Sequence, residues 1–240
     1  MSAVGIIQAR MSSSRLPGKV LMPIKGQPML YYVCRRSSWA KSLNQIVVAT
    51  SSDKSDKPIV NFCKENAMDC FMGELEDVLA RYYNVAKKNR AKIIVRITAD
   101  CPLIDGFLIE KALHVFKHVK ADYLSNTLER TYPRGFDFEI FTFEALSAAF
   151  FNARRAIERE HVTPYIWQNK SELFRLKNFR RKNDKSRYRI TVDTLSDFLL
   201  VKLLIEKYRA DLKRSNQIIR ILELHPELSE INKNIKQKEI

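Results

Sequence analysis

Short apolar segments alternate with longer segments of helical periodicity through the first half of this chain. Four apolar segments have the length and composition of buried strands, at residues 4–7, 45–50, 70–72 and 92–97. Between and after them, apolar residues recur every three or four positions, which predicts helices at residues 29–40, 58–66, 76–89 and 107–117. This alternation predicts an α/β fold with a mostly parallel, doubly wound sheet that carries helices on both faces.

The second half of the chain is predicted to be richer in helices, at residues 143–151, 157–168 and 195–208. Candidate strands lie at residues 122–125, 136–141 and 188–192, the last of which is predicted to end at Asp193. We expect one domain at residues 1–210, followed by a C-terminal helical extension at residues 211–240. The chain beyond Leu228 is expected to be frayed.

The loop that follows the first strand is the leading candidate for a binding site. It carries three cations, Arg10, Arg15 and Lys19, with three consecutive serines and no acid. Such cations, together with the hydroxyl and backbone donors of a turning loop, suit the oxygens of a polyphosphate. The spacing matches neither a Walker A loop nor a dinucleotide-binding glycine motif. A solvated basic loop is the alternative, but ligands of open α/β sheets bind beyond the carboxyl ends of strands, where this loop is predicted.

Two aspartates are predicted at the same edge of the sheet. Asp100 follows the fourth apolar strand, and Asp193 ends the candidate strand at residues 188–192. Two carboxylates that face a cationic loop can hold Mg²⁺ against the phosphates of a nucleotide. The alternative is structural for both residues, because Asp100 can accept from backbone donors in a turn and Thr194 can cap a helix that starts after Asp193.

Other strand ends supply further candidate contacts. Thr50 and Ser51 end the second strand, which implies a second segment that faces the ligand. Arg96 and Thr98 lie at the end of the fourth strand. Arg96 is interpreted as a donor to a base carbonyl or, alternatively, as a buried charge paired with an acid such as Asp105.

The segment at residues 133–139 is a candidate for holding a second substrate. Gly135 allows a tight turn, and Asp137 and Glu139 alternate along one face of the predicted strand. Carboxylates in this arrangement suit a hydroxyl-rich substrate.

The net charge of +15 and the pI near 9.7 are compatible with nucleic acid, an anionic membrane or phosphorylated small molecules as partners. Cations are densest at residues 177–189, with aromatic residues between them, so a nucleic-acid-binding module is an alternative function. A solvated hairpin is the commoner origin of such a run. No apolar run suits a membrane span and the start lacks the pattern of a signal peptide, so we expect a cytoplasmic protein with reduced cysteines.

The first loop resembles the signature loop of the cytidylyltransferases that make CMP-activated acidic sugars, the 3-deoxy-manno-octulosonate and acylneuraminate enzymes. It is most similar to their relatives in spore-coat polysaccharide biosynthesis, and the matching residues are Gln8-Ala9-Arg10, Ser12-Ser13 and Arg15-Leu16-Pro17-Gly18-Lys19. The resemblance continues at Asp100, at Asp193 in an Asp-Thr-x-x-Asp motif, at residues 133–139 and at Arg-Glu-His-Val-Thr-Pro-Tyr of residues 159–165. Around Asp100 the octulosonate enzymes have Gln-Gly-Asp-Glu-Pro, whereas this chain has Thr-Ala-Asp-Cys-Pro.

The resemblance implies a Rossmann-like nucleotide-diphospho-sugar transferase fold with appended helices and a Mg²⁺-dependent transfer of CMP from CTP to an acidic or amino sugar for surface polysaccharide. It also implies a homodimer. Catalytic roles are expected for Arg10, Lys19, Asp100 and Asp193, with both aspartates as Mg²⁺ ligands. Nucleotide contacts are expected from Ala9, Arg10, Ser12, Ser13, Arg15, Lys19, Thr50, Ser51, Arg96 and Thr98, and sugar contacts from Asp137, Glu139, Glu160 and His161. A glycosyltransferase on a similar fold is an alternative, although the chain has only Asp-Phe-Glu at residues 137–139 in place of a D-x-D metal motif.

Overall fold

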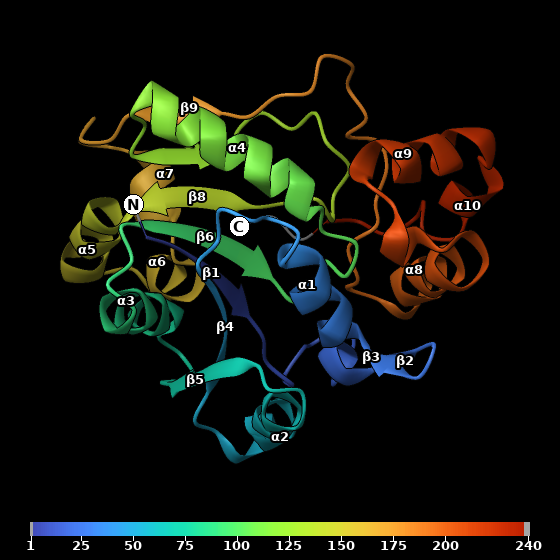
Figure 1. The fold of residues 1–240 in the computed structure, drawn as a ribbon, viewed down its shortest axis with the longest axis horizontal. Coiled ribbons are helices and arrows are strands. Elements are labelled where there is room, and N and C mark those ends of the chain that lie inside the picture. Colours follow the sequence, from blue (N-terminus) through green and yellow to red (C-terminus); the bar gives the residue numbers. More distant parts are fainter. Residues whose placement is uncertain (1, 238–240) are drawn as a thin grey trace.

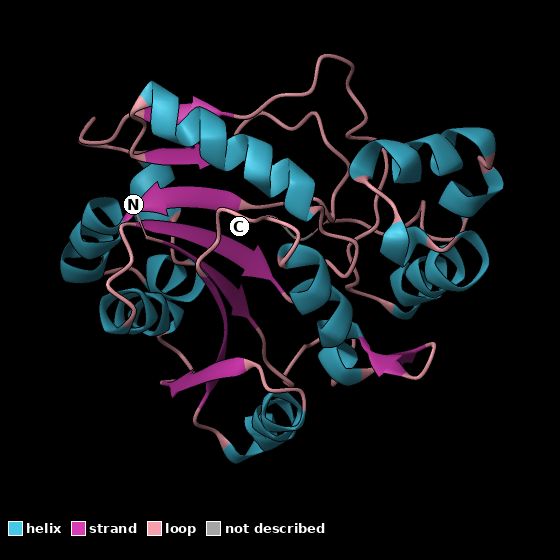
Figure 2. Ribbon diagram, viewed as in Figure 1, coloured by secondary structure: helices cyan, strands magenta, loops and turns pink. Residues whose placement is uncertain are grey.

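A seven-stranded sheet with the order β5-β4-β1-β6-β8-β7-β9 forms the centre of the computed structural model, which describes residues 2–237 (Figures 1 and 2). Strands β5, β4, β1 and β6 run parallel, β8 is antiparallel to β6 and β7, and β9 is parallel to β7. The predicted α/β fold with a mostly parallel sheet is therefore confirmed. The strands of this sheet are β1 (Ala3–Gln8), β4 (Gln45–Ser51), β5 (Asp69–Gly73), β6 (Ile93–Thr98), β7 (Tyr123–Ser125), β8 (Glu139–Thr142) and β9 (Leu176–Asn178).

Helices cover both faces of this sheet. One layer buries its apolar residues in a cluster with one sheet face and contains α1 (Met29–Ser37), α2 (Lys57–Glu65), α4 (Gly106–Val119), α8 (Leu195–Tyr208) and α9 (Ser215–Leu224). The other layer contains α3 (Val78–Lys88), α5 (Phe143–Asn152), α6 (Ala156–His161) and α7 (Pro164–Gln168). The remaining elements are a hairpin of β2 (Pro23–Ile24) and β3 (Gln27–Pro28), three short 3₁₀ helices (Lys19–Leu21, Lys54–Asp56 and Ala210–Leu212) and α10 (Glu227–Glu230).

Three of the elements predicted in the second half differ in the structure. The single helix predicted at residues 157–168 is two helices, because Val162 adopts a φ of +71° and Pro164 begins α7. Residues 188–192 are not a strand of the sheet: among the described residues they form one isolated bridge, between Arg189 and Arg134, and Arg134 itself lies outside the strands of the sheet. The predicted strand at residues 136–141 begins only at Glu139.

The C-terminal segment packs against the rest of the chain. Ile218, Leu222 and Leu228 belong to the same buried cluster as residues of β1 and β6. Asn232 is 5% exposed, so the expectation of a frayed end beyond Leu228 is wrong for the described residues. Residues 238–240 of the predicted extension lie outside the described residues. Figure 1 shows α8, α9 and α10 grouped together at one side of the sheet.

Gly135 allows residues 188–192 to approach the segment that precedes β8. Its φ is +110°, and a Cβ at this position would lie 2.7 Å from the backbone carbon of Ile190 and the nitrogen of Thr191. We expect Gly135→Ala to lower the free energy of unfolding by about 2 kcal/mol or more, because both the dihedral and the contact become strained. Urea denaturation measures this loss. Gly26→Ala is the matched control, since Gly26 has a φ of +74° but open space around it; an equal loss in both variants would contradict the role of close approach.

Within residues 2–237, no helix is both long enough and apolar enough to cross a membrane.

Candidate active site

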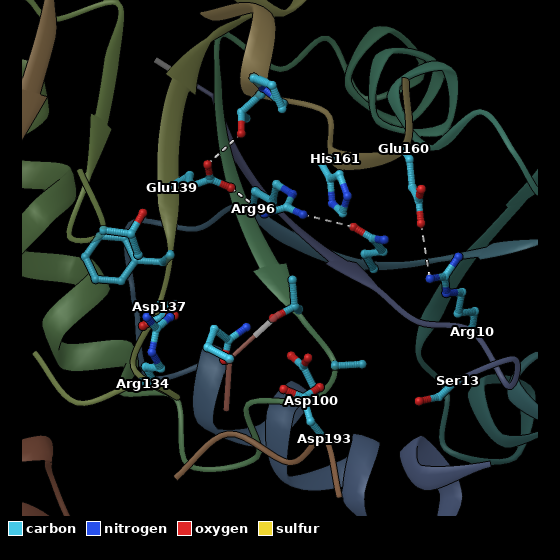
Figure 3. A pocket seen from close by; sticks show the side chains of 18 of the residues that line it. Arg10, Ser13, Arg96, Asp100, Arg134, Asp137, Glu139, Glu160, His161 and Asp193 are labelled. Carbon is cyan, nitrogen blue, oxygen red and sulfur yellow. Dashed lines mark hydrogen bonds and ion pairs between the residues drawn. The ribbon is translucent and has the colours of Figure 1, made fainter. Parts of the chain in front are cut away.

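A cavity of about 590 Å³ lies at the edge of the sheet where β1 and β6 end. The loop after β1, the loop after β6, the start of β8 and the helix α6 all contribute to its wall. Twelve residues that the sequence singled out line this cavity: Arg10, Ser13, Arg15, Lys19, Arg96, Thr98, Asp100, Asp137, Glu139, Glu160, His161 and Asp193. Figure 3 shows how ten of the lining side chains from these elements converge.

Lys19 joins the two predicted metal-binding aspartates. Its Nζ lies 2.9 Å from Asp193 Oδ1 and 3.6 Å from Asp100 Oδ2, and it donates to the Val192 carbonyl at 2.6 Å. The lysine is only 8% exposed, so water competes little for its charge. The prediction that the cationic loop and both aspartates meet is confirmed by this contact, which Figure 3 shows as the close approach of Asp100 and Asp193.

Asp193 is surrounded by cations. Besides Lys19, Arg15 lies 3.0 Å and Arg189 2.8 Å from Asp193 Oδ2. Burial alone would raise the pKa of Asp193, but Lys19, Arg189 and Arg15 together hold this pKa below its usual range. The Asp193 carboxyl is therefore ionised at neutral pH.

A buried aspartate, Asp56, fixes the backbone of the cationic loop. Asp56 Oδ1 accepts from the Met11 backbone N–H at 2.7 Å, and Asp56 Oδ2 accepts from the Ser51 hydroxyl at 2.5 Å. Thr50 and Ser51 are almost fully buried and do not line the cavity. Their predicted contacts with the nucleotide are therefore wrong, because Ser51 supports the loop through Asp56 instead.

Two predicted loop contacts also lie outside the cavity wall. Ala9 is 2% exposed, and its backbone N–H donates to the Ala49 carbonyl. Ser12 is exposed and does not line the cavity, whereas the neighbouring Ser13 and Ser14 do. The turn that Ser13 makes with the Met11 carbonyl, at 3.0 Å, points this part of the loop toward the cavity.

Glu139 lies in a buried hydrogen-bond network in the wall of the cavity. Its carboxylate accepts from Arg96 Nη1 at 2.5 Å and from the hydroxyls of Tyr123 and Thr163 at 2.6 Å each. The alternative that Arg96 is a buried charge paired with an acid is confirmed, although the acid is Glu139 and not Asp105, which caps α4. With three protein donors, Glu139 orients Arg96 in this structure, and its predicted contact with the sugar stays a prediction.

The other predicted sugar contacts lie around the mouth. Glu160 Oε1 lies 3.4 Å from Arg10 Nη2, and both side chains are more than 40% exposed. Asp137 receives a bidentate bond from Arg130, at 2.6 and 2.9 Å. Burial lowers the pKa of His161, and the nearby Arg96 and Arg10 charges act in the same direction, so the ring is neutral at pH 7.

Sequence reasoning missed several residues of the cavity wall. Arg134 lies within the segment that was singled out at residues 133–139, Arg130 precedes that segment by three positions, and Trp167 follows the segment at residues 159–165 by two positions. Proximity to those segments was the only available signal. Gln8, Ser14, Ala99, Phe138, Thr163 and Pro164 lie within the singled-out segments but were given no role of their own, and nothing in the local pattern marked Val20, Tyr123, Thr127, Leu128 and Gln237 as lining residues.

The two aspartates have suitable chemistry for Mg²⁺, which commonly takes one or two carboxylates and completes its shell with phosphate oxygens and water. Asp100 and Asp193 direct oxygens at the same Lys19 Nζ, so a single cation can contact both. Residues 2–237 contain no cluster of three His, Cys, Asp or Glu side chains that would hold a metal alone. Any metal here would therefore depend on substrate oxygens for its remaining ligands.

Three of the seven cations at residues 177–189 pair with acidic side chains. Arg180 pairs with Glu129, Lys185 with Glu223 and Arg189 with Asp193, each at 2.8 Å, and Arg181 donates to the neutral Asn216. Part of the charge run therefore has partners within the chain. The alternative of a nucleic-acid-binding module therefore gains no support from the described residues.

Comparison with known proteins agrees with this geometry. A family model described as cytidylyltransferase matches residues 4–239. The chain is 37% identical over 240 residues to an uncharacterized protein of Methanocaldococcus jannaschii, covering 99% of this chain and 97% of that protein. It is 31% identical over 232 residues to the spore coat polysaccharide biosynthesis protein SpsF of Bacillus subtilis, covering 92% and 94%. A solved cytidylyltransferase from Leptospira borgpetersenii matches with a TM-score of 0.91 at 31% identity, covering 100% of both chains. The chain therefore belongs to the cytidylyltransferase family.

Proposed function

We propose that this cytidylyltransferase uses CTP to activate an acidic or amino sugar, giving a CMP-sugar and pyrophosphate for surface polysaccharide synthesis, with Mg²⁺ as its cofactor. The observation that carries the proposal is the contact of Lys19 with Asp100 and Asp193 beside a loop of cations. The similarity to a spore coat polysaccharide biosynthesis protein supports the polysaccharide role.

In the proposed reaction, a sugar hydroxyl oxygen forms a bond to the α-phosphorus of CTP. The bond from that phosphorus to the bridging oxygen of the β-phosphate breaks, pyrophosphate leaves with the electron pair, and the hydroxyl proton passes to water. Arg10 and Arg15 lie on the loop with partly exposed guanidinium groups, so they can turn from Glu160 and Asp193 to the departing pyrophosphate. Mg²⁺ held by Asp100 and Asp193 would neutralise charge on the phosphate oxygens.

The protein contributes mainly orientation and charge to this reaction. Lys19 is fixed by two hydrogen bonds, to Val192 and Asp193, and by an ion pair with Asp100, so it presents its positive charge at one point of the cavity. At the other end, Asp137 is fixed by Arg130, and neutral His161 offers one donor and one acceptor to sugar hydroxyls. These two groups are the proposed sugar contacts, with Glu160 at the mouth.

A nucleotide panel tests the proposal. We expect CTP with Mg²⁺ to raise the thermal unfolding midpoint more than ATP, GTP or UTP does, because a ligand that binds only the folded state stabilises it in proportion to occupancy. Pyrophosphate release with CTP and candidate 2-keto-3-deoxy acids or amino sugars then identifies the acceptor. Equal shifts with all four nucleotides, or no CTP-dependent release with any sugar, would contradict the proposal.

The implied homodimer stays a prediction. Sedimentation equilibrium of the full chain measures its mass in solution directly.

A further inference from the structure

Asp193 lies outside the regular sheet, and side chains contribute to fixing its position beside the backbone bond from Val192 to Asp100. Residues 188–192 have only the bridge between Arg134 and Arg189 as a ladder contact. The backbone N–H of Asp193 donates to Asp197 Oδ2 at 3.0 Å, and its carboxylate accepts from Arg189. The Asp193 main chain and side chain therefore both depend on the pair formed by Arg189 and Asp197.

The pair of Arg189 and Asp197 is buried. Asp197 is 0% exposed and accepts from Arg189 Nε at 2.8 Å and from Arg189 Nη2 at 3.1 Å. The same Nη2 donates to Asp193 Oδ2 at 2.8 Å. The Arg189 guanidinium therefore bridges the carboxylates of Asp197 and Asp193 and fixes the distance between them.

Asn232 completes this pair from the C-terminal segment. Its Nδ2 donates to Asp197 Oδ1 at 2.8 Å and to the Arg189 carbonyl at 3.2 Å. The side chain is 5% exposed, so its amide has little access to water and is costly to bury without these acceptors. Arg189 Nη1 also donates to Gln237 Oε1 at 2.6 Å, further along the same segment.

We infer that Asn232 is a positioning residue, through which the C-terminal segment holds Arg189 and Asp197 in the arrangement that aims Asp193 at the metal and triphosphate. This inference rests on the proposed function, because it assigns Asn232 to the metal end of that site. Without the Asn232 amide, Asp197 Oδ1 keeps one donor instead of two. The Arg189 carbonyl loses the same donor, so Arg189 is held less firmly against Asp193, although Asp197 Oδ2 keeps its bonds to Asp193 and Thr194.

The Mg²⁺ dependence of CTP binding separates positioning from a purely structural role. Asp193 contributes to binding chiefly when Mg²⁺ bridges it to the phosphates, so a defect that acts through Asp193 appears in Mg²⁺ and vanishes in EDTA. A loosened C-terminal segment that does not act through Asp193 would weaken CTP binding by a similar factor in Mg²⁺ and in EDTA, or would leave it unchanged in both.

Isothermal titration of the full chain with CTP, in Mg²⁺ and in EDTA, tests the inference. We expect Asn232→Ala to raise the dissociation constant about five- to tenfold in Mg²⁺ and less than about twofold in EDTA, consistent with the loss of a hydrogen bond to a charged group. Asn232→Ser, which keeps a donor, is expected to fall between wild type and Asn232→Ala, and it replaces the alanine variant if that protein does not fold.

Ile218→Ala is the matched control. Ile218 is fully buried on α9 and contacts none of the network through a hydrogen bond, so its truncation lowers the denaturation midpoint while leaving the effect of Mg²⁺ on CTP binding unchanged. If Asn232→Ala binds CTP like wild type, or if its CTP binding is weakened equally in Mg²⁺ and in EDTA, the inference is overturned but the proposed function is not. A wild-type protein that binds no CTP, or binds it without regard to Mg²⁺, would overturn the proposed function and the inference together.

Discussion

Replacement of Lys19 by methionine is expected to reduce the rate of pyrophosphate release at least about a hundredfold. Methionine keeps the length of the buried side chain but removes the charge that meets Asp100, Asp193 and the Val192 carbonyl. The free energy of unfolding should also fall, by about 3 kcal/mol, because two carboxylates then face each other without their shared cation. Steady-state assays and urea denaturation of Lys19→Met measure the two effects.

Magnesium provides a second readout on the same variant. In Lys19→Met, Mg²⁺ is expected to raise the unfolding midpoint more than it does in wild type, because the dication takes the place of the missing ammonium between the two aspartates. Lys25→Met is the control, since Lys25 is exposed in the β2–β3 hairpin. It should change stability by no more than about 0.5 kcal/mol. Turnover of Lys19→Met within threefold of the Lys25→Met value would refute the central role of Lys19.

The elements that the sequence predicted well are those buried on both faces. Strands β1, β4 and β6 appear as nearly continuous apolar runs because helices cover each side of a parallel sheet. Residues 188–192 carry a similar pattern and are also buried, yet their backbone bonds go to Asp100 and Arg134 rather than to a neighbouring strand. An apolar sequence pattern indicates that a segment is buried, but it does not indicate which other segment its backbone hydrogen-bonds to.

In the site, too, residues next to strand ends could be predicted from the sequence, whereas residues that reach it from distant segments could not. Arg10, Lys19 and Asp100 follow strand ends directly, so their position in the chain indicates the edge of the sheet that they share. Asp56 and Asn232 reach the site from distant segments, and no local pattern marks either one. Arg189 belongs to a charge run that is usually solvated, and only the fold shows that its partners Asp193 and Asp197 bury it.

Arg36 links the N-terminal half of the chain to its C-terminal helices. The guanidinium is fully buried in α1 and donates five hydrogen bonds, at 2.7 to 3.0 Å, to backbone carbonyls. The acceptors lie before α4 and before α9, at Leu103, Ile104, Ala210, Asp211 and Lys213. One side chain thereby supplies donors to five backbone carbonyls, of which that of Ala210 also accepts from the Lys213 backbone N–H, and it fixes α1 against the C-terminal segment.

The Arg36→Met variant is therefore expected to lose about 5 kcal/mol or more of unfolding free energy, because several buried carbonyls lose their donors at about 1–3 kcal/mol each. Such a loss is comparable to the whole stability of a typical domain, so the variant should unfold at low urea or be digested rapidly by protease. Arg35→Met, one position earlier on α1, is the matched control. Arg35 is largely exposed and reaches Asp211 at only 3.9 Å, which predicts a loss below about 1 kcal/mol. Similar urea midpoints for the two variants would show that the carbonyls before α4 and α9 find other partners, and that Arg36 does not hold the C-terminal helices in place.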